Sequence, residues 1–169
     1  WIASKEGLSR LNRKTGEFNF YQNIPSDNTS LPSNLVRNVF CDSKGNIWVC
    51  TDAGGLTKVI REGEKVVFRN YRHRLQGNMT GNDATMIISI WEENHGTFWL
   101  GTYGAGLQKF DLNGERFESY TEEDGLPNNV VYGVLGDNSG NLWLSTNHGL
   151  SRFDIDKEEF QNYLAKDGL

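Results

Sequence analysis

Short apolar runs alternate with turn residues along the whole chain. In the last quarter the runs cover residues 130–135, 142–146, 149–154 and 159–163, with Gly, Asn and Asp between them. Several runs are apolar on both faces, which is typical of strands that lie between two neighbouring sheets. No segment of ten or more residues carries helical spacing with caps. The pattern therefore predicts an all-β protein with helix content near zero.

The same pattern recurs four times, and each copy opens on a tryptophan. The four tryptophans are 44 to 51 residues apart: Trp1, Trp48, Trp99 and Trp143. Each is followed by Ser or Thr, a Gly-Leu pair, a basic residue and a Phe-x-x-Tyr motif, which reads Phe18/Tyr21, Phe68/Tyr71, Phe117/Tyr120 and Phe160/Tyr163. A period of about 45 residues that holds four short strands is the signature of a β-propeller blade.

The predicted fold is a β-propeller fragment of three complete four-stranded blades plus one three-stranded blade. We place the boundaries at 1–34 (an incomplete blade with strands 2–4, and its connector), 35–86, 87–129 and 130–169. Residue 1 is itself the tryptophan of a second strand. Propellers close with about four to eight blades, so we expect this single partial propeller to pair with the remaining blades of a parent propeller or with itself. An open end exposes a large aromatic face.

The repeated aromatic residues are interpreted as filling between blades, because a residue needed in every blade is not specific to one site. The two cysteines raise a separate question. Cys41 and Cys50 flank a hairpin at equal distances and can face each other across the ladder. Cys50, however, stands in a column of small residues, namely Ala3, Gly101 and Ser145. A cramped site of this kind favours a free, packed thiol.

Composition excludes several functional classes. The 169 residues carry a formal net charge of −5 without any basic block, which argues against nucleic-acid binding. No apolar run approaches the roughly 18 residues of a membrane helix, and no signal peptide is visible. Two cysteines are too few for a disulfide scaffold. We expect a segment without membrane contact.

Catalytic motifs are also absent from the sequence. The three histidines, His73, His95 and His148, have no metal-ligand spacing with one another or with a cysteine. The Asp-x-x-Gly turns lack the further acidic ligands of a calcium loop. Neither a Gly-x-Ser-x-Gly nucleophile motif nor a phosphate-binding loop occurs. The sequence predicts no catalytic residue, no metal and no cofactor.

Residues that break the repeat point to a ligand-binding face. Loops between second and third strands emerge on the same face of a propeller as the connectors between blades. The departures are Asp52, Tyr103 and His148 in the short loops, Arg72, His73, Arg74 and Asn78 in the long connector, and Trp91, whose column holds Leu135 elsewhere. Aromatic stacking on sugar rings with polar hydrogen bonds would suit glycan capture. The alternative is that these are ordinary solvated loops and that Trp91 fills the core.

Several strings together resemble the two-component regulator propeller repeat. Asp-x-x-Gly-Asn-x-Trp-x-x-Thr reads 137–146, Gly-Leu-x-Arg-Phe-Asp reads 149–154, and Asp-Gly-Leu-Pro-Asn-Asn reads 124–129. The resemblance covers essentially the whole chain. The second unit departs from it, since Val59-Ile60 replaces Phe-Asp and the connector 72–85 lacks Gly-Leu-Pro.

The resemblance implies a role in signalling. Such repeats are typical of the sensor regions of hybrid two-component systems in Bacteroidetes, which lie outside the inner membrane and often sense oligosaccharides. It implies a periplasmic, non-catalytic segment that binds an oligosaccharide or a partner subunit, with ligand shifting the population of paired sensor arrangements. Two other functions remain open: a protein-interaction scaffold, and part of a propeller glycoside hydrolase or lyase whose catalytic carboxylates lie elsewhere.

Overall fold

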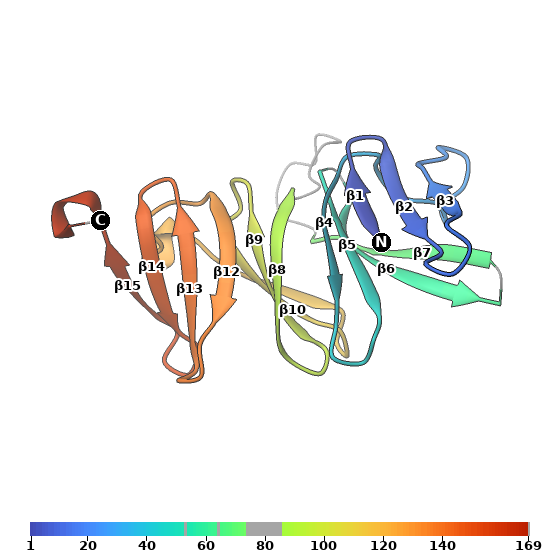
Figure 1. The fold of residues 1–169 in the computed structure, drawn as a ribbon. Helices are drawn as coiled ribbons and strands as arrows, with labels where there is room; N and C mark the ends of the chain where they lie inside the picture. The colour runs from blue at the N-terminus through green and yellow to red at the C-terminus, as the bar shows by residue number, and fades with distance from the viewer. Residues whose placement is uncertain (53, 64, 74–85, 169) are drawn as a thin grey trace. The chain divides into compact units, whose positions relative to one another are not determined.

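Four antiparallel sheets make up the chain in the computed structural model, which describes residues 1–52, 54–63, 65–73 and 86–168. In each sheet the neighbouring strands are consecutive in sequence (Figure 1). The chain divides into two compact units, Trp1–Ile87 and Ile88–Leu169, and each is described by itself below.

The first unit holds a three-stranded and a four-stranded sheet. The three-stranded sheet consists of β1 (Ile2–Ser4), β2 (Gly7–Leu11) and β3 (Phe18–Tyr21). The four-stranded sheet consists of β4 (Val36–Cys41), β5 (Ile47–Thr51), β6 (Gly55–Glu62) and β7 (Lys65–Tyr71).

The second unit holds two four-stranded sheets. One consists of β8 (Ile87–Asn94), β9 (Thr97–Thr102), β10 (Leu107–Asp111) and β11 (Arg116–Tyr120). The other consists of β12 (Val131–Gly136), β13 (Asn141–Thr146), β14 (Gly149–Asp154) and β15 (Glu159–Tyr163). Helical structure in the described ranges is limited to two short 3₁₀ turns, η1 (Glu122–Asp124) and η2 (Ala165–Asp167). The predicted all-β propeller fragment, with one three-stranded and three four-stranded blades, is confirmed.

Each sheet has two chemically different faces, because side chains alternate along a strand. We call the side that bears the repeated Trp and Tyr the tryptophan face, and the side that bears the Phe of Phe-x-x-Tyr the phenylalanine face. In the second unit the rings of Trp99 and Tyr120 contact Phe153 of the next sheet, with centroids 5.4 and 5.0 Å apart. In the first unit Tyr21 meets Phe68 edge-on at 5.7 Å. Within each unit the tryptophan face of the first sheet therefore packs against the phenylalanine face of the second.

The repeated tryptophans differ in burial. Trp48 and Trp99 are 0% exposed, whereas Trp143 is 37% exposed. Trp143 lies in the β12–β15 sheet, on a side that no other described sheet covers. The buried aromatic filling is confirmed for Trp48 and Trp99, and Trp143 lies on an uncovered aromatic face of the kind expected for a partial propeller.

An acidic residue six positions before each of three tryptophans ties the hairpin turn to the sheet. Asp42 accepts a hydrogen bond from Trp48 Nε1 at 2.9 Å, and Glu93 accepts one from Trp99 Nε1 at 2.8 Å. The equivalent bond of Trp143 to Asp137 is 3.0 Å long. The carboxylates at 42 and 137 also accept turn amides. The turn interpretation of these residues is correct but incomplete, since the same carboxylate also holds the indole.

The two cysteines do not face each other. Cys41 pairs with Ile47 and Cys50 pairs with Asn38, because the turn is centred closer to Cys41 than the sequence suggests and a β-bulge shifts the register. Both thiols are free, Cys41 at the surface and Cys50 buried. The expected free thiol at Cys50 is confirmed, and the expectation that the two residues can lie opposite each other is wrong.

Burial of Cys50 has a consequence for stability at alkaline pH. Burial raises the pKa of this thiol from 9.0 to about 12. The unfolded chain loses the proton first, so the free energy of unfolding should fall as pH rises from about 9 to about 12. We expect Cys50→Ala to flatten this dependence in urea titrations run at several pH values. Cys41→Ala, at an exposed site, serves as the control and should leave the slope as it is; equal slopes in all three proteins would contradict the assignment.

Candidate functional site: the loop face

At one end of each four-stranded sheet the first strand begins, the fourth strand ends and the loop between the second and third strands lies; in the three-stranded sheet the β1–β2 loop holds this place. We call this end the loop face and treat it separately in each unit. Two β-bulges shape it: the register shifts between Val36 and Asn38 in β4, and between Val131 and Gly133 in β12. The extra residues are Arg37 and Tyr132. A bulge re-aims the side chain of the inserted residue, and bulges often lie beside functional sites.

Each bulge residue bonds to the first residue after the second strand of its own sheet. In the first unit Arg37 Nη2 donates to Asp52 Oδ2 at 2.8 Å, and Arg37 Nε donates to Asp52 Oδ1. These bonds raise the pKa of the Arg37 guanidinium. In the second unit the Tyr132 hydroxyl donates to Asn147 Oδ1 at 3.0 Å. The same backbone arrangement therefore presents an ion pair in one sheet and a neutral tyrosine–asparagine hydrogen bond in the other.

Aromatic and amide groups gather on the loop face of the second unit. Tyr103 is 57% exposed and forms an isolated bridge with Val130, which joins the β9–β10 loop to the start of the last sheet. Tyr132 is also exposed. The His148 backbone amide donates to Thr146 Oγ1 at 3.1 Å, and its ring Nδ1 lies 3.0 Å from a backbone carbonyl oxygen, that of Pro127. Because a carbonyl oxygen only accepts, Nδ1 carries the proton in this arrangement.

Charged groups predominate on the loop face of the first unit. Lys5 occupies the position in the β1–β2 loop that Asp52 occupies in the β5–β6 loop. With Leu35, Val36 and Arg37 it lines a small hollow of about 40 Å³. Arg37, which lines this hollow, is the residue that pairs with Asp52.

The long connector is only partly described. Arg72 is exposed and follows directly after β7, while His73 is half-buried and burial lowers the pKa of its imidazole. Arg74 and Asn78, which the sequence also singled out, lie outside the described residues.

The structure places Trp91 away from this face. Its side chain is half-buried in β8 and packs against the hydrophobic core of the second unit. The indole covers Gly136 of β12, where a Cβ atom would overlap the ring. Trp91 thus packs on a glycine of the next sheet, as the alternative interpretation of its sequence position held.

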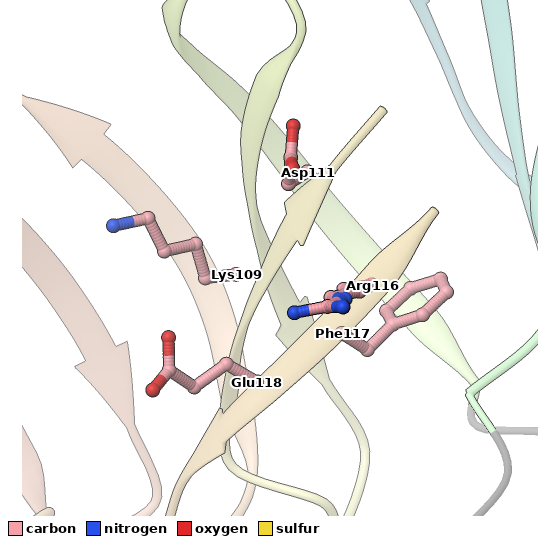
Figure 2. Close-up of a pocket in the computed structure, with 5 residues that line it drawn as sticks. All are labelled: Lys109, Asp111, Arg116, Phe117 and Glu118. Atoms are coloured by element: carbon pink, nitrogen blue, oxygen red, sulfur yellow. The ribbon is translucent and has the colours of Figure 1, made fainter. Parts of the chain in front are cut away.

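A separate hollow lies on the outer strands of the third sheet (Figure 2). It measures about 400 Å³ and is lined by Lys109, Asp111, Arg116, Phe117 and Glu118. Lys109, Arg116 and Glu118 extend to one side of the strands in Figure 2, and the Phe117 ring extends to the other. Two cations and two carboxylates balance each other, so the hollow offers no net charge that would select a ligand. The Lys109 Nζ atom also lies 5.1 Å from the centroid of the Trp99 ring. We interpret the hollow as a solvated edge of the sheet.

Metal and membrane features were searched over the same residues. The described ranges hold no group of three or more His, Cys, Asp or Glu side chains placed to bind a metal ion. Within the part of the chain that the structure covers, no helix has the length and hydropathy of a membrane span.

Sequence reasoning found Asp52, Tyr103 and His148 on this face but missed the bulge residues and Asn147. A usable signal exists in the columns. The residue after the first buried position of the first strand is Arg37, Ile88 or Tyr132 in the three four-stranded sheets, while the buried position itself stays aliphatic. A position that varies directly beside a position that is always aliphatic indicates a side chain that does not pack in the core.

The geometry thus defines a β-propeller segment in which the backbone of the sheets repeats while the side chains on the loop face vary. Residues 30–53 and 125–148 match the family model described as "Two component regulator propeller". The resemblance to this family is confirmed, and the chain carries its repeats.

Three relatives place these repeats in context. Over 148 residues the chain is 30% identical to histidine kinase P4 of Formosa agariphila, which covers 85% of the chain and 10% of the kinase. The extracellular domain of the hybrid two component system BT3049 from B. thetaiotaomicron is 26% identical, with a TM-score of 0.75 over 95% of the chain and 21% of that domain's chain. The extracellular domain of BT4673 from the same organism shares the fold, with a TM-score of 0.80, 20% identity, and coverage of 99% and 24%. The chain spans about a tenth to a quarter of these relatives, and it is homologous to extracellular domains of hybrid two-component systems.

Proposed function

We propose that this chain is a non-catalytic, periplasmic sensor segment of a hybrid two-component system that recognises an oligosaccharide on its loop face. The observation that supports this most is the pair of bulge positions. The frame repeats from sheet to sheet, while the side chains it presents change from Arg37–Asp52 to Tyr132–Asn147. Packing alone gives no reason for such a change, because these side chains leave the core.

The loop face of the second unit has the chemistry of sugar recognition. Tyr103 and Tyr132 offer exposed rings, and aromatic rings bind the apolar faces of sugars while their hydroxyls bond to polar groups. The amide of Asn147 and the imidazole of His148 add hydrogen-bonding groups at the same end of the sheet. A few polar groups beside apolar surface fix the orientation of a small ligand.

The periplasmic location and the signalling role rest on similarity to the extracellular domain of the B. thetaiotaomicron system. A ligand transmits a signal only if it binds one arrangement of the sensor more tightly than another. Capture on loops that join successive sheets suits this requirement, because those loops move when neighbouring sheets shift.

Calorimetry against a panel of neutral and uronic-acid oligosaccharides tests the proposal. We expect at least one member to bind, and we expect Tyr132→Ala and Tyr103→Ala each to weaken it about tenfold or more, as the loss of an aromatic anchor does. Asn138→Ala is the matched control, since this exposed residue lies in the hairpin at the opposite end of the same sheet. Absence of heat with every panel member would favour a docking scaffold and contradict the proposal.

A further inference from the structure

A hollow on the outer two strands of the second sheet is lined by positive charge. It measures about 380 Å³ and lies on β6 and β7, beside the residue that precedes β5. Its polar lining residues are Asn46, Lys58, Arg61, Arg69 and Tyr71. Three of these are cations, and the described residues that line the hollow include no carboxylate. Because the whole chain carries a formal net charge of −5, we call this local exception the basic hollow.

The charge pattern of the basic hollow departs from that of the repeat. Lys58 and Arg69 lie directly opposite each other on β6 and β7. The same two positions hold Arg10 and Asn19 in the first sheet, Lys109 and Glu118 in the third, and Arg152 and Gln161 in the last. Like charges directly opposite each other destabilise a sheet. Packing gives no reason for the pair, since the other three sheets do without it.

The hollow of the third sheet provides the comparison within the chain (Figure 2). Lys109 and Glu118 line it at the positions that Lys58 and Arg69 hold in the basic hollow. The third sheet therefore has a balanced pair where the second sheet has two cations. The backbone positions are equivalent, so the difference between the two hollows is one of charge.

Two of the cations are placed by aromatic rings of their own sheet. Lys58 Nζ lies 5.4 Å from the centroid of the Trp48 ring, and Arg69 Cζ lies 5.2 Å from that of Tyr71. A cation at such a distance is attracted to the face of the ring. Lys58 is half-buried, whereas Arg61 and Arg69 are exposed. The charged groups are thus positioned at the hollow and accessible to a solute.

Neighbouring carboxylates do not line the basic hollow. Asp42 accepts a hydrogen bond from Asn46 Nδ2 at 2.8 Å, but it is buried and also accepts bonds from Trp48 Nε1 and two turn amides. Glu62 lies opposite Lys65, which is not a lining residue either. Because the hydrogen bonds of Asp42 are directed to the turn and the indole, this carboxylate leaves the cations of the hollow to a ligand.

We propose that the basic hollow binds a tetrahedral oxyanion, namely the sulfate or phosphate ester group of a larger ligand. Such a group presents three terminal oxygens that accept charge-assisted hydrogen bonds. A guanidinium donates to two oxygens at once, and a lysine ammonium acts as a compact point charge. A carboxylate has only two oxygens for the three cations. The volume lies within the range of about 300–1,000 Å³ that is typical of small-molecule sites, which leaves room for the rest of the ligand.

Isothermal titration calorimetry with six solutes tests the proposal: inorganic sulfate, inorganic phosphate, glucose 6-sulfate, glucose 6-phosphate, glucuronate and glucose. We expect saturable binding of both ions and both esters, and the ester with the higher affinity identifies the source of the oxyanion. Glucuronate should bind at least about tenfold more weakly than that ester. Glucose should give no heat that depends on residue 69, which separates this site from sugar recognition on the loop face.

Arg69→Glu is the decisive variant, because it gives the second sheet the charge pair that Lys109 and Glu118 form in the third. We expect it to weaken binding of the better ester at least about tenfold. Its free energy of unfolding should stay the same or rise, since a like-charge pair is removed. Lys65→Gln is the matched control: it removes an exposed cation of the same strand outside the lining and should bind as the wild type does.

Arg61→Gln keeps the test decisive if Arg69→Glu does not fold, because this exposed residue also lines the hollow. It should weaken binding of the better ester severalfold. Three results would overturn the proposal: no saturable binding of sulfate or phosphate, an affinity for the ester that both variants leave unchanged, and glucuronate that binds as tightly as the better ester. Ions that bind while neither ester does indicate an adventitious ion only and overturn it as well.

Discussion

Replacing Asp42 with alanine is expected to lower the free energy of unfolding of the first unit by about 3 kcal/mol. The Asp42 carboxylate is buried and accepts hydrogen bonds from Trp48 Nε1, Asn46 Nδ2 and the backbone amides of Lys44 and Asn46, at 2.7–3.0 Å. Its removal strands the indole N–H of a tryptophan that is 0% exposed, and a buried unsatisfied donor costs about 1–3 kcal/mol. Loss of the charge-assisted bonds to the turn adds to this cost. Urea denaturation followed by circular dichroism measures the change.

Asp137→Ala is the matched control for this prediction. Asp137 holds the equivalent position in the hairpin turn of the last sheet and accepts the equivalent set of hydrogen bonds. The bond from the Asn141 backbone amide is the main cause that lowers the pKa of Asp137 to about 2. Trp143, however, is partly exposed, so water can replace the lost partner. We expect a clearly smaller loss of stability than for Asp42→Ala. Equal losses in the two variants would show that the turn, and not the buried indole, determines the cost.

Gly136→Ala is expected to destabilise the second unit by about 2–3 kcal/mol. A Cβ atom at this position would overlap the Trp91 indole, and overpacking of a core typically costs about 1–3 kcal/mol. The indole cannot move away freely because it packs against the core formed by the last two sheets. Thermal unfolding of the variant, compared with the wild type, measures the effect.

The double variant Trp91→Leu/Gly136→Ala decides whether the two positions act together. Leu135 shows that leucine is compatible with the Trp91 column. We expect the methyl group at 136 to cost much less when residue 91 is leucine. The coupling energy between the two changes should then be about 1 kcal/mol or more, as is typical of neighbouring core residues. Strictly additive effects would contradict direct packing of Trp91 on Gly136.

The repeat explains why so much of the fold could be predicted from the sequence. Columns such as Trp48/Trp99 and the Gly-Leu pairs recur because each sheet needs the same core contacts, so strand positions follow from them to within about a residue. The predicted runs 142–146 and 149–154, for example, correspond to β13 and β14.

The candidate site was harder to predict for two physical reasons. A bulge adds one residue to a strand without changing the composition of that strand, so the sequence offers only the variation of the column that holds Arg37 and Tyr132, and the bulge itself is seen in the register. The place of Trp91 depends on Gly136 in another sheet, and a comparison of columns cannot show which residues meet across sheets.

The most direct measurement of recognition on the loop face is a map of amide chemical shifts in the ¹⁵N-labelled chain during titration with the oligosaccharide panel. The predicted result is a set of perturbed amides at residues 102–104, 128–132 and 147–148 with at least one panel member. Perturbations confined to the hairpin 137–141 or to the strands around the hollow of Figure 2, or no perturbation with any member, would contradict it.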